Sequence, residues 1–246
     1  MNRIWLGLAL LLTLSVPLWG QNSQGSNSQS GPVIVDRDAT LYGRGYSEWD
    51  AEWQQWADSI PIENHPLFDN GDCSVGQSGP VWFLGGKFCP AGTSCSATFS
   101  RSCTIPSSKA IFFTALDYED SAIEETTAEN PSNPDAALIG NMRSTIYNAM
   151  NTATAYAILD GVAIPNFQKK FRVQSPAFSL TLPNDDLWSG IYGVHFEPGP
   201  HYPAVDEGWF GLLPTLSPGH HVLQFGGNIG AFNFSITATY FLNVTR

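Results

Sequence analysis

Residues 232–244 read FNFSITATYFLNV, and this stretch indicates the fold class of the chain. Its apolar side chains recur at every second position, at Phe232, Phe234, Ile236, Ala238 and Tyr240. Polar side chains fill the positions between them. A period of two places these two sets on opposite faces of an extended backbone. We therefore expect a long β-strand with one face toward a core and the other toward water.

The region before this strand shows the same period in shorter segments. Residues 153–159 and 162–164 flank the dipeptide Asp160-Gly161, which predicts a β-hairpin with a two-residue turn. Further strands are expected at 79–88, 109–116, 178–182, 191–196, 208–213 and 221–225. Turn signals such as Ser217-Pro218-Gly219 separate them. This pattern favours a mainly β protein, an antiparallel β-sandwich of Ig-like or jelly-roll-like type.

Two helices are expected to pack on the sandwich, at about 47–60 and 134–150. In the first, Trp49, Trp53 and Trp56 share one face of the helix. Such a face is either an open aromatic platform for sugar rings or a buried packing surface, and burial is the commoner case.

Both expected helices carry sequence signals at or near their first turn. Ser47 is the expected cap of the first helix, and Asn133 that of the second. In the second helix an apolar residue recurs every four positions from Leu138 to Met150, which predicts a stripe that faces the core.

The first twenty residues have the layout of a secretory signal peptide, with Arg3 followed by an apolar run and a short polar exit. The run is shorter than the roughly 20 residues of a stable transmembrane helix. Residues 21–32 are rich in Gln, Asn, Ser and Gly and read as a disordered linker, and residues 33–246 as a single domain. We expect a secreted, periplasmic or cell-surface protein with no transmembrane anchor after cleavage.

The chain has four cysteines, all in one short segment, and in a secreted protein an even number predicts disulfides. Of the three possible pairings we favour the nested one, Cys73–Cys103 outside and Cys89–Cys95 inside. A zinc site is the alternative, but the spacing lacks the close pairs that are typical of zinc ligands.

The charge balance excludes one class of partner. The chain has 11 basic and 22 acidic residues, a net charge of −11. Nucleic-acid binding depends on clustered Lys and Arg, and no stretch has such a cluster. We therefore expect no nucleic-acid partner.

Two groups of residues are candidate metal ligands. Asp117, Glu119 and Asp120 open an acidic segment that could supply oxygens to calcium. The spacing matches no EF-hand, and a solvated acidic loop is the simpler interpretation. His195 and Glu197 would share one face of the expected strand at 191–196 and its exit, and they are close to further His and carboxylate residues. No metallohydrolase motif accompanies them, so chance proximity is the simpler interpretation.

The sequence contains no recognisable catalytic motif, and Gly-x-Ser-x-Gly is absent. We therefore expect a disulfide-stabilised binding protein, whose ligand is an envelope or extracellular glycan or another protein. One alternative is a secreted hydrolase with a carboxylate/His site assembled from loops 117–130 and 195–207. Another is a structural component of a surface or matrix.

Several phrases of the sequence together resemble one protein family. They are EWxxxWxxW from Glu48 followed by Ser59-Ile60-Pro61, then GQSGPVWFL at 76–84 and Ser217-Pro218-Gly219 followed by two His residues. This combination is similar to a family of secreted or cell-envelope bacterial proteins, over about residues 43–245. The resemblance implies secretion and brings no activity, cofactor or substrate.

Overall fold

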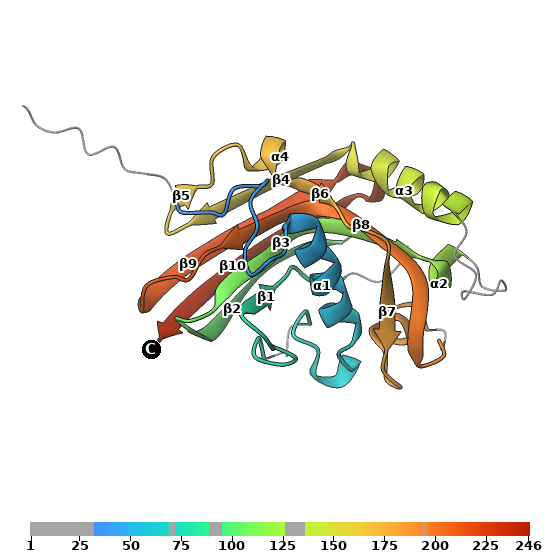
Figure 1. Ribbon diagram of the computed structural model, residues 1–246, viewed down its shortest axis with the longest axis horizontal. Helices are drawn as coiled ribbons and strands as arrows, with labels where there is room; N and C mark the ends of the chain where they lie inside the picture. Colours follow the sequence, from blue (N-terminus) through green and yellow to red (C-terminus); the bar gives the residue numbers. More distant parts are fainter. Residues whose placement is uncertain (1–31, 69–71, 89–94, 126–135, 194) are drawn as a thin grey trace, which may run out of the picture. The chain divides into compact units, whose positions relative to one another are not determined.

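The computed structural model of the chain describes residues 32–68, 72–88, 95–125, 136–193 and 195–246 (Figure 1). The expected signal peptide at 1–20 and nearly all of the expected linker lie outside these residues. Gly31–Arg246 forms one unit by its internal contacts. Within the described ranges, no helix has the length and apolar character needed to cross a membrane.

Strands dominate the fold and form two five-stranded sheets. The first sheet contains β1 (Val81–Leu84), β3 (Ala110–Ser121), β6 (Arg172–Gln174), β7 (Phe178–Leu182) and β8 (Gly199–Leu213). The second contains β2 (Ser96–Pro106), β4 (Ala153–Leu159), β5 (Val162–Ala163), β9 (Gly219–Ile229) and β10 (Phe234–Thr245). The strand orders are β1-β3-β8-β6, with β7 also on β8, and β2-β10-β9-β4-β5. The expectation of a mainly β protein is thus confirmed.

Both sheets are mixed, which differs from the antiparallel expectation. β1 runs parallel to β3, and β2 runs parallel to β10, while the remaining pairs are antiparallel. Parallel neighbours need a long connection between them. The connection from β1 to β3 contains β2, and β2 and β10 are separated by most of the other strands. Periodicity does not reveal such pairings.

The described residues contain five α-helices, three more than expected. They are α1 (Tyr46–Asp58), α2 (Ala122–Glu125), α3 (Ala136–Met150), α4 (Phe167–Lys170) and α5 (Leu187–Tyr192). α1 lies across one face of the first sheet and contacts β7, β8, β6 and β3 (Figure 1). α3 contacts β8 and β3. Short helices were missed because one turn leaves no repeating pattern.

The two longest helices lie where the sequence indicates. Gly45 rather than Ser47 caps α1, and its N–H donates to the Glu48 carboxylate at 2.7 Å. In α3 the expected stripe is confirmed, because Met142, Ile146 and Met150 are buried. The expected cap of this helix lies outside the described residues.

The expected strand at 191–196 is wrong, because this region contains the end of α5 and an irregular connection to β8. Asp186 caps α5, and its carboxylate accepts hydrogen bonds from the Ser189 N–H at 2.7 Å and the Ser189 hydroxyl at 2.6 Å. Gly193 ends the helix in the left-handed conformation at φ 67°. A cap and a terminal glycine therefore override a weak alternation.

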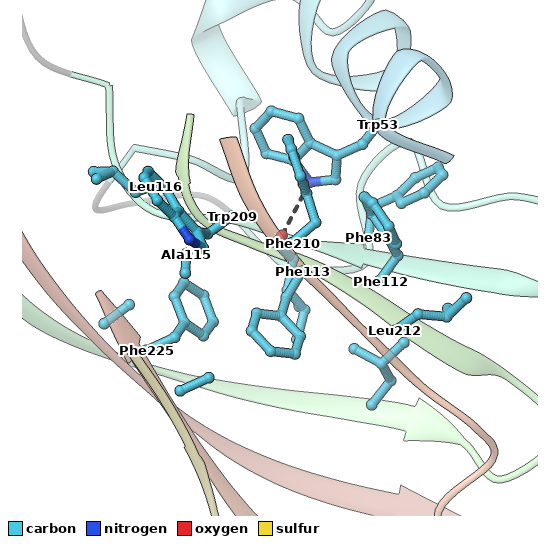
Figure 2. Packing of buried hydrophobic residues seen from close by; sticks show 14 of the residues in the cluster. Trp53, Phe83, Phe112, Phe113, Ala115, Leu116, Trp209, Phe210, Leu212 and Phe225 are labelled. Carbon is cyan, nitrogen blue, oxygen red and sulfur yellow. Dashed lines mark hydrogen bonds between the residues drawn. The ribbon is translucent and has the colours of Figure 1, made fainter. Parts of the chain in front are cut away.

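Aromatic rings form the core between the two sheets. Phe113 of β3 stacks on Phe225 of β9, with ring centroids 5.0 Å apart (Figure 2). Phe225 also stacks on Tyr240 of β10, with ring centroids 5.7 Å apart. On the α1 side of β3, Phe112 stacks on Phe210 of β8 at 5.4 Å. The first sheet is thus covered by aromatic packing on both faces.

A disulfide joins Cys73 to Cys103, as predicted, and ties the segment after α1 to β2. Cys89 lies outside the described residues, so the inner pairing Cys89–Cys95 stays a prediction. The described cysteines include no free thiol.

Candidate functional site

Helix α1 presents two buried stripes to the first sheet. Trp49, Trp53 and Trp56 form the aromatic stripe and are at most 7% exposed, so the tryptophan face is a packing surface and not an open platform. Trp53 donates its indole N–H to the Leu84 carbonyl at 2.9 Å. The aromatic stripe fixes the rotation of the helix over β1 and β3.

The second stripe of α1 is polar and equally buried. Asp50, Gln54 and Asp58 follow at intervals of four residues and are at most 1% exposed. Residues four apart lie one above the other on a helix. Gln54 donates its side-chain N–H to the Asp58 carboxylate at 3.0 Å. Two carboxyl groups are therefore held at the interface between α1 and the sheet.

A β-bulge at Ala115 turns two further acids toward α1. Thr114 pairs with Phe210 and Leu116 with Trp209, so Ala115 is an extra residue on β3. The extra residue shifts the alternation by one position. Asp117 and Glu119 therefore lie on the same sheet face as Thr114, the face that α1 covers.

β8 adds the fifth carboxyl group. Asp206 lies directly across from Glu119 in the antiparallel pair, and Gly208 lies across from Asp117. Paired residues share one face of the sheet. A Cβ atom at Gly208 would lie 2.4 Å from the Leu116 carbonyl oxygen and 2.8 Å from the Asp117 Cβ, so this position needs glycine.

We name these five residues the acid cluster: Asp50, Asp58, Asp117, Glu119 and Asp206. Asp117 is partly exposed, and the other four are at most 6% exposed. Burial, which disfavours the charged form, is the first cause that raises the pKa of each of the five carboxyl groups. The pKa of Asp206 rises to about 6.

Asp50 of α1 and Asp206 of β8 interact electrostatically within the acid cluster. Burial and then the negative charge of Asp206 raise the pKa of Asp50, which disfavours its charged form. The positive field of Arg143 opposes these effects only in part.

The raised pKa values favour the protonated form of the acid cluster, and the cavity beside the cluster is small. A cavity of about 50 Å³ borders it at Asp117 and is also lined by Trp53, Lys87, Phe88 and Thr114, among others. This space suits a few water molecules and is too small for a sugar ring. Among the described residues, no group of three or more His, Cys, Asp and Glu is arranged to hold a metal ion.

The candidate metal ligands expected from sequence are separated by the fold. Asp117 and Glu119 belong to the acid cluster, while Asp120 is buried on the opposite face of β3. His195 and Glu197 are exposed in the irregular connection before β8. The acidic segment at its start is strand and helix and not a loop, since β3 continues to Ser121 and α2 follows.

A surface groove lies on the opposite face of β8. Asp206 faces the acid cluster, and the next residue, Glu207, points to the other side, as successive strand residues do. The groove has a volume of about 410 Å³. We name it the Tyr147 groove, and its lining residues are Arg37, Tyr147, Arg172, Val173, Gln174 and Glu207.

Arg172 is the best-fixed polar side chain of the Tyr147 groove. Its guanidinium lies 5.4 Å from the Tyr147 ring centroid and 5.3 Å from that of Trp209. It also pairs with Glu207 and donates to the Asn151 side chain at 2.9 Å. These contacts hold the guanidinium plane beside an aromatic ring that is 52% exposed.

Glu207 orients its neighbours and is not free to act as a base. One carboxylate oxygen accepts from Arg172, and the other accepts from the Gln174 side chain at 2.7 Å. It is the single carboxylate among the described lining residues, whereas glycoside hydrolysis uses two. The arrangement suits recognition of a polar ligand better than its cleavage.

Sequence reasoning missed both the polar stripe of α1 and the Tyr147 groove. The spacing of Asp50, Gln54 and Asp58 was a usable signal. Residues four apart form a stripe along the helix, and this polar stripe lies beside the tryptophan stripe that was expected to be buried. The groove had no such signal, since Tyr147 and Glu207 are brought together only by the packing of α3 on β8.

Comparison with known proteins finds no family model, curated protein or solved structure that matches the chain.

Proposed function

We propose that this chain is a secreted binding protein that recognises a glycan in the Tyr147 groove. The supporting scaffold would be a β-sandwich of Ig-like or jelly-roll-like type, stabilised by the Cys73–Cys103 disulfide. Disulfides persist in oxidising compartments, which agrees with the signal peptide that the first twenty residues predict.

The observation that carries the proposal is the pairing of an exposed aromatic ring with fixed planar polar groups. Tyr147 offers an apolar ring face, and Arg172, Gln174 and Asn151 offer donors and acceptors around it. Sugar rings have apolar C–H faces with hydroxyl groups at their edges, and they match such a surface. The volume of about 410 Å³ lies within the range of small-ligand sites.

The groove also differs in charge from the rest of the molecule. It contains two arginines against one carboxylate, in a chain of net charge −11. A neutral or acidic sugar is therefore favoured over a cationic ligand. A glycan is favoured over another protein as the ligand, because the groove is concave and rich in planar polar groups.

The test is titration of the protein with a panel of soluble neutral and acidic oligosaccharides, followed by calorimetry. Tyr147→Ala should weaken binding at least 10-fold, which corresponds to about 1.4 kcal/mol. Tyr147→Phe should retain most of the affinity because the ring face remains. Tyr42→Ala is the matched control, since Tyr42 is similarly exposed at 47% but does not line the groove.

Equal loss of affinity in the Tyr147→Ala and Tyr42→Ala variants would contradict the groove as the site. If the protein binds no oligosaccharide of the panel, the proposal that its ligand is a glycan is contradicted.

Hydrolysis is a second candidate, and one observation favours it. The segments that were expected to form a carboxylate site, around 117 and 206, are neighbours in one sheet, and Glu119 lies across from Asp206. The pKa values of both carboxyl groups are raised, as those of general acids in catalysis often are. Because α1 covers them, the reaction would require this helix to move. Release of reducing sugar from a polysaccharide, lost in Glu119→Gln, would support hydrolysis, and retained release in that variant would contradict it.

A further inference from the structure

The outer face of the second sheet is an ordered array of uncharged polar side chains. In β10, Ile236, Ala238 and Tyr240 point inward and are buried. The alternate residues point outward, and β2 alternates in the same way beside them. The outward positions of these two strands are Ser96, Thr98, Ser100, Ser102, Thr104, Ser235, Thr237, Thr239, Phe241 and Asn243.

β9 and β4 extend this surface, which we name the hydroxyl face. Their outward residues are His220, Val222, Gln224, Gly226 and Asn228 on β9, and Thr154, Tyr156 and Ile158 on β4. The register aligns them in rows across the sheet. One row contains Thr98, Thr237, Gly226 and Tyr156, and the next contains Ser100, Thr239, Gln224 and Ile158.

Hydrogen bonds between strands hold these side chains in place. Asn228 donates to the Thr154 hydroxyl at 2.7 Å, and Gln224 donates to the Thr239 hydroxyl at 3.3 Å. The hydroxyl groups of Tyr156 and Thr237 lie 3.1 Å apart. Along a strand, outward residues are about 6.6–6.8 Å apart, and adjacent strands are about 4.8 Å apart. The result is a fixed two-dimensional grid of donors and acceptors.

None of these outward positions holds Asp, Glu, Lys or Arg, although the chain has 33 such residues in 246. The nearby Arg101 is not an exception, because it points inward and donates to the Gly86 carbonyl at 2.9 Å and to the Tyr240 hydroxyl at 2.8 Å. A surface without charge on a protein of net charge −11 neither attracts nor repels a neutral partner.

We propose that the hydroxyl face docks on an extended surface of neutral polysaccharide, as a second site independent of the Tyr147 groove. A grid of hydroxyl and amide groups can exchange hydrogen bonds with the sugar hydroxyls of neighbouring chains. The exposed rings of Tyr156 and Phe241 can contact the apolar faces of sugar rings.

Other occupants fit the hydroxyl face less well. A charged partner would meet no charged side chain at the outward positions named above. Lys87, beside Thr98 and Ser100, and Asp160, beside Val222, have opposite charges and lie near different strands of the sheet. A second copy of the chain would gain little apolar area, because Phe241 and Val222 are the exposed large aliphatic or phenyl side chains on it, and stable dimers bury a hydrophobic patch.

The experiment measures sedimentation of the full chain with microcrystalline cellulose and with chitin, which serve as neutral insoluble probes. Two double variants place charges of opposite sign on the face: Ser100→Glu with Phe241→Glu, and Ser100→Lys with Phe241→Lys. The matched controls place the same charges at Ser144 and Thr145, which are exposed on α3. Thermal unfolding confirms that each variant is folded.

We expect the wild type to bind at least one probe, and both face variants to lose at least 10-fold in affinity. Both controls should bind as the wild type does. The face variants should still bind soluble oligosaccharides as the wild type does, which separates this site from the groove. The proposal is overturned if the wild type sediments with neither cellulose nor chitin, or if the face variants bind these probes as the wild type does.

Discussion

The face of β3 and β8 beneath α1 and the outer face of β2, β10, β9 and β4 distribute charge in opposite ways. The first is covered and contains the acid cluster of five carboxyl groups. The second is exposed and has no charged residue at its outward positions. Most proteins place carboxylates in water and keep the interior apolar. In this protein one covered face contains carboxyl groups, and one exposed face has no charge at its outward positions. We infer that each face serves a purpose other than solubility.

The two faces also differ in their effect on the stability of the fold. Hydroxyl groups at the surface keep their hydrogen bonds to water, so the hydroxyl face is nearly neutral for stability. Buried carboxyl groups lose hydration and remain stable only in the protonated form or beside a cation. The acid cluster therefore makes the stability of the fold depend on pH, and the hydroxyl face does not.

The largest expected effect is a fall in the free energy of unfolding as the pH rises from 4 to 8. A carboxyl group with a raised native pKa stabilises the fold below its unfolded pKa, and this contribution is lost as the pH rises toward the native pKa. For Asp206 the change from 3.8 to about 6 corresponds to about 3 kcal/mol. The other four carboxyl groups act in the same direction. Urea denaturation at several pH values measures the sum.

His65 opposes this trend and must be included in the comparison. Burial lowers its pKa from 6.5 to about 4, and this loss of hydration outweighs its hydrogen bond to the Ala57 carbonyl. The native state therefore resists protonation of His65, and stability is lost as the pH falls from 6.5 toward 4. One histidine acts against five carboxyl groups, so we expect the net fall with rising pH to persist. Stability that instead rises steadily from pH 4 to pH 8 would contradict the acid cluster.

A smaller effect is expected when one member of the cluster is made permanently neutral. Asp206→Asn should raise the free energy of unfolding at pH 8 by about 1–3 kcal/mol, because the ionised carboxylate is removed from the interior. At pH 4, where Asp206 is already protonated, the same substitution should change little. The matched control is Asp38→Asn, since the Asp38 side chain is 88% exposed and should be insensitive at both pH values. Equal effects of Asp206→Asn at pH 4 and pH 8 would show that the carboxyl group does not titrate in this range.

The smallest effect is expected on the hydroxyl face. Thr237→Val keeps the β-branched shape and removes the hydroxyl group that meets Tyr156. We expect the free energy of unfolding to change by no more than about 0.5 kcal/mol, as for other surface substitutions. A loss of several kcal/mol in thermal or urea unfolding would mean that the hydroxyl face is needed for stability. The two faces would then no longer differ in their effect on the free energy of unfolding.

The sequence predicts those parts of the fold whose signals are local. The hairpin of β4 and β5 follows from Asp160-Gly161, which adopt φ values of 51° and 78° as a two-residue turn requires. The tryptophan stripe and the outer disulfide follow from spacing and from cysteine number. β2 was missed because its polar alternate residues and its position between cysteines resemble a loop.

The candidate site was predicted only in part, for two physical reasons. Asp117 and Glu119 were identified as notable acids, but the bulge at Ala115 decides which face they occupy, and a single inserted residue has no clear signature. His195 and Glu197 were placed on one strand face, and the capped helix α5 removes that strand. Contacts between distant segments, such as Asp50 with Asp206, lie beyond any local pattern.

The position of β10 between β2 and β9 in the second sheet has a consequence for the order of folding. This last strand pairs with β2 on one side and with β9 on the other, and the hydrogen bond between Arg101 and Tyr240 spans 139 residues. The second sheet cannot be completed until β10 (Phe234–Thr245) has been synthesised. Contacts of such long sequence separation form slowly. In a growing chain, β2 and β9 therefore lack the strand that lies between them until β10 has been made.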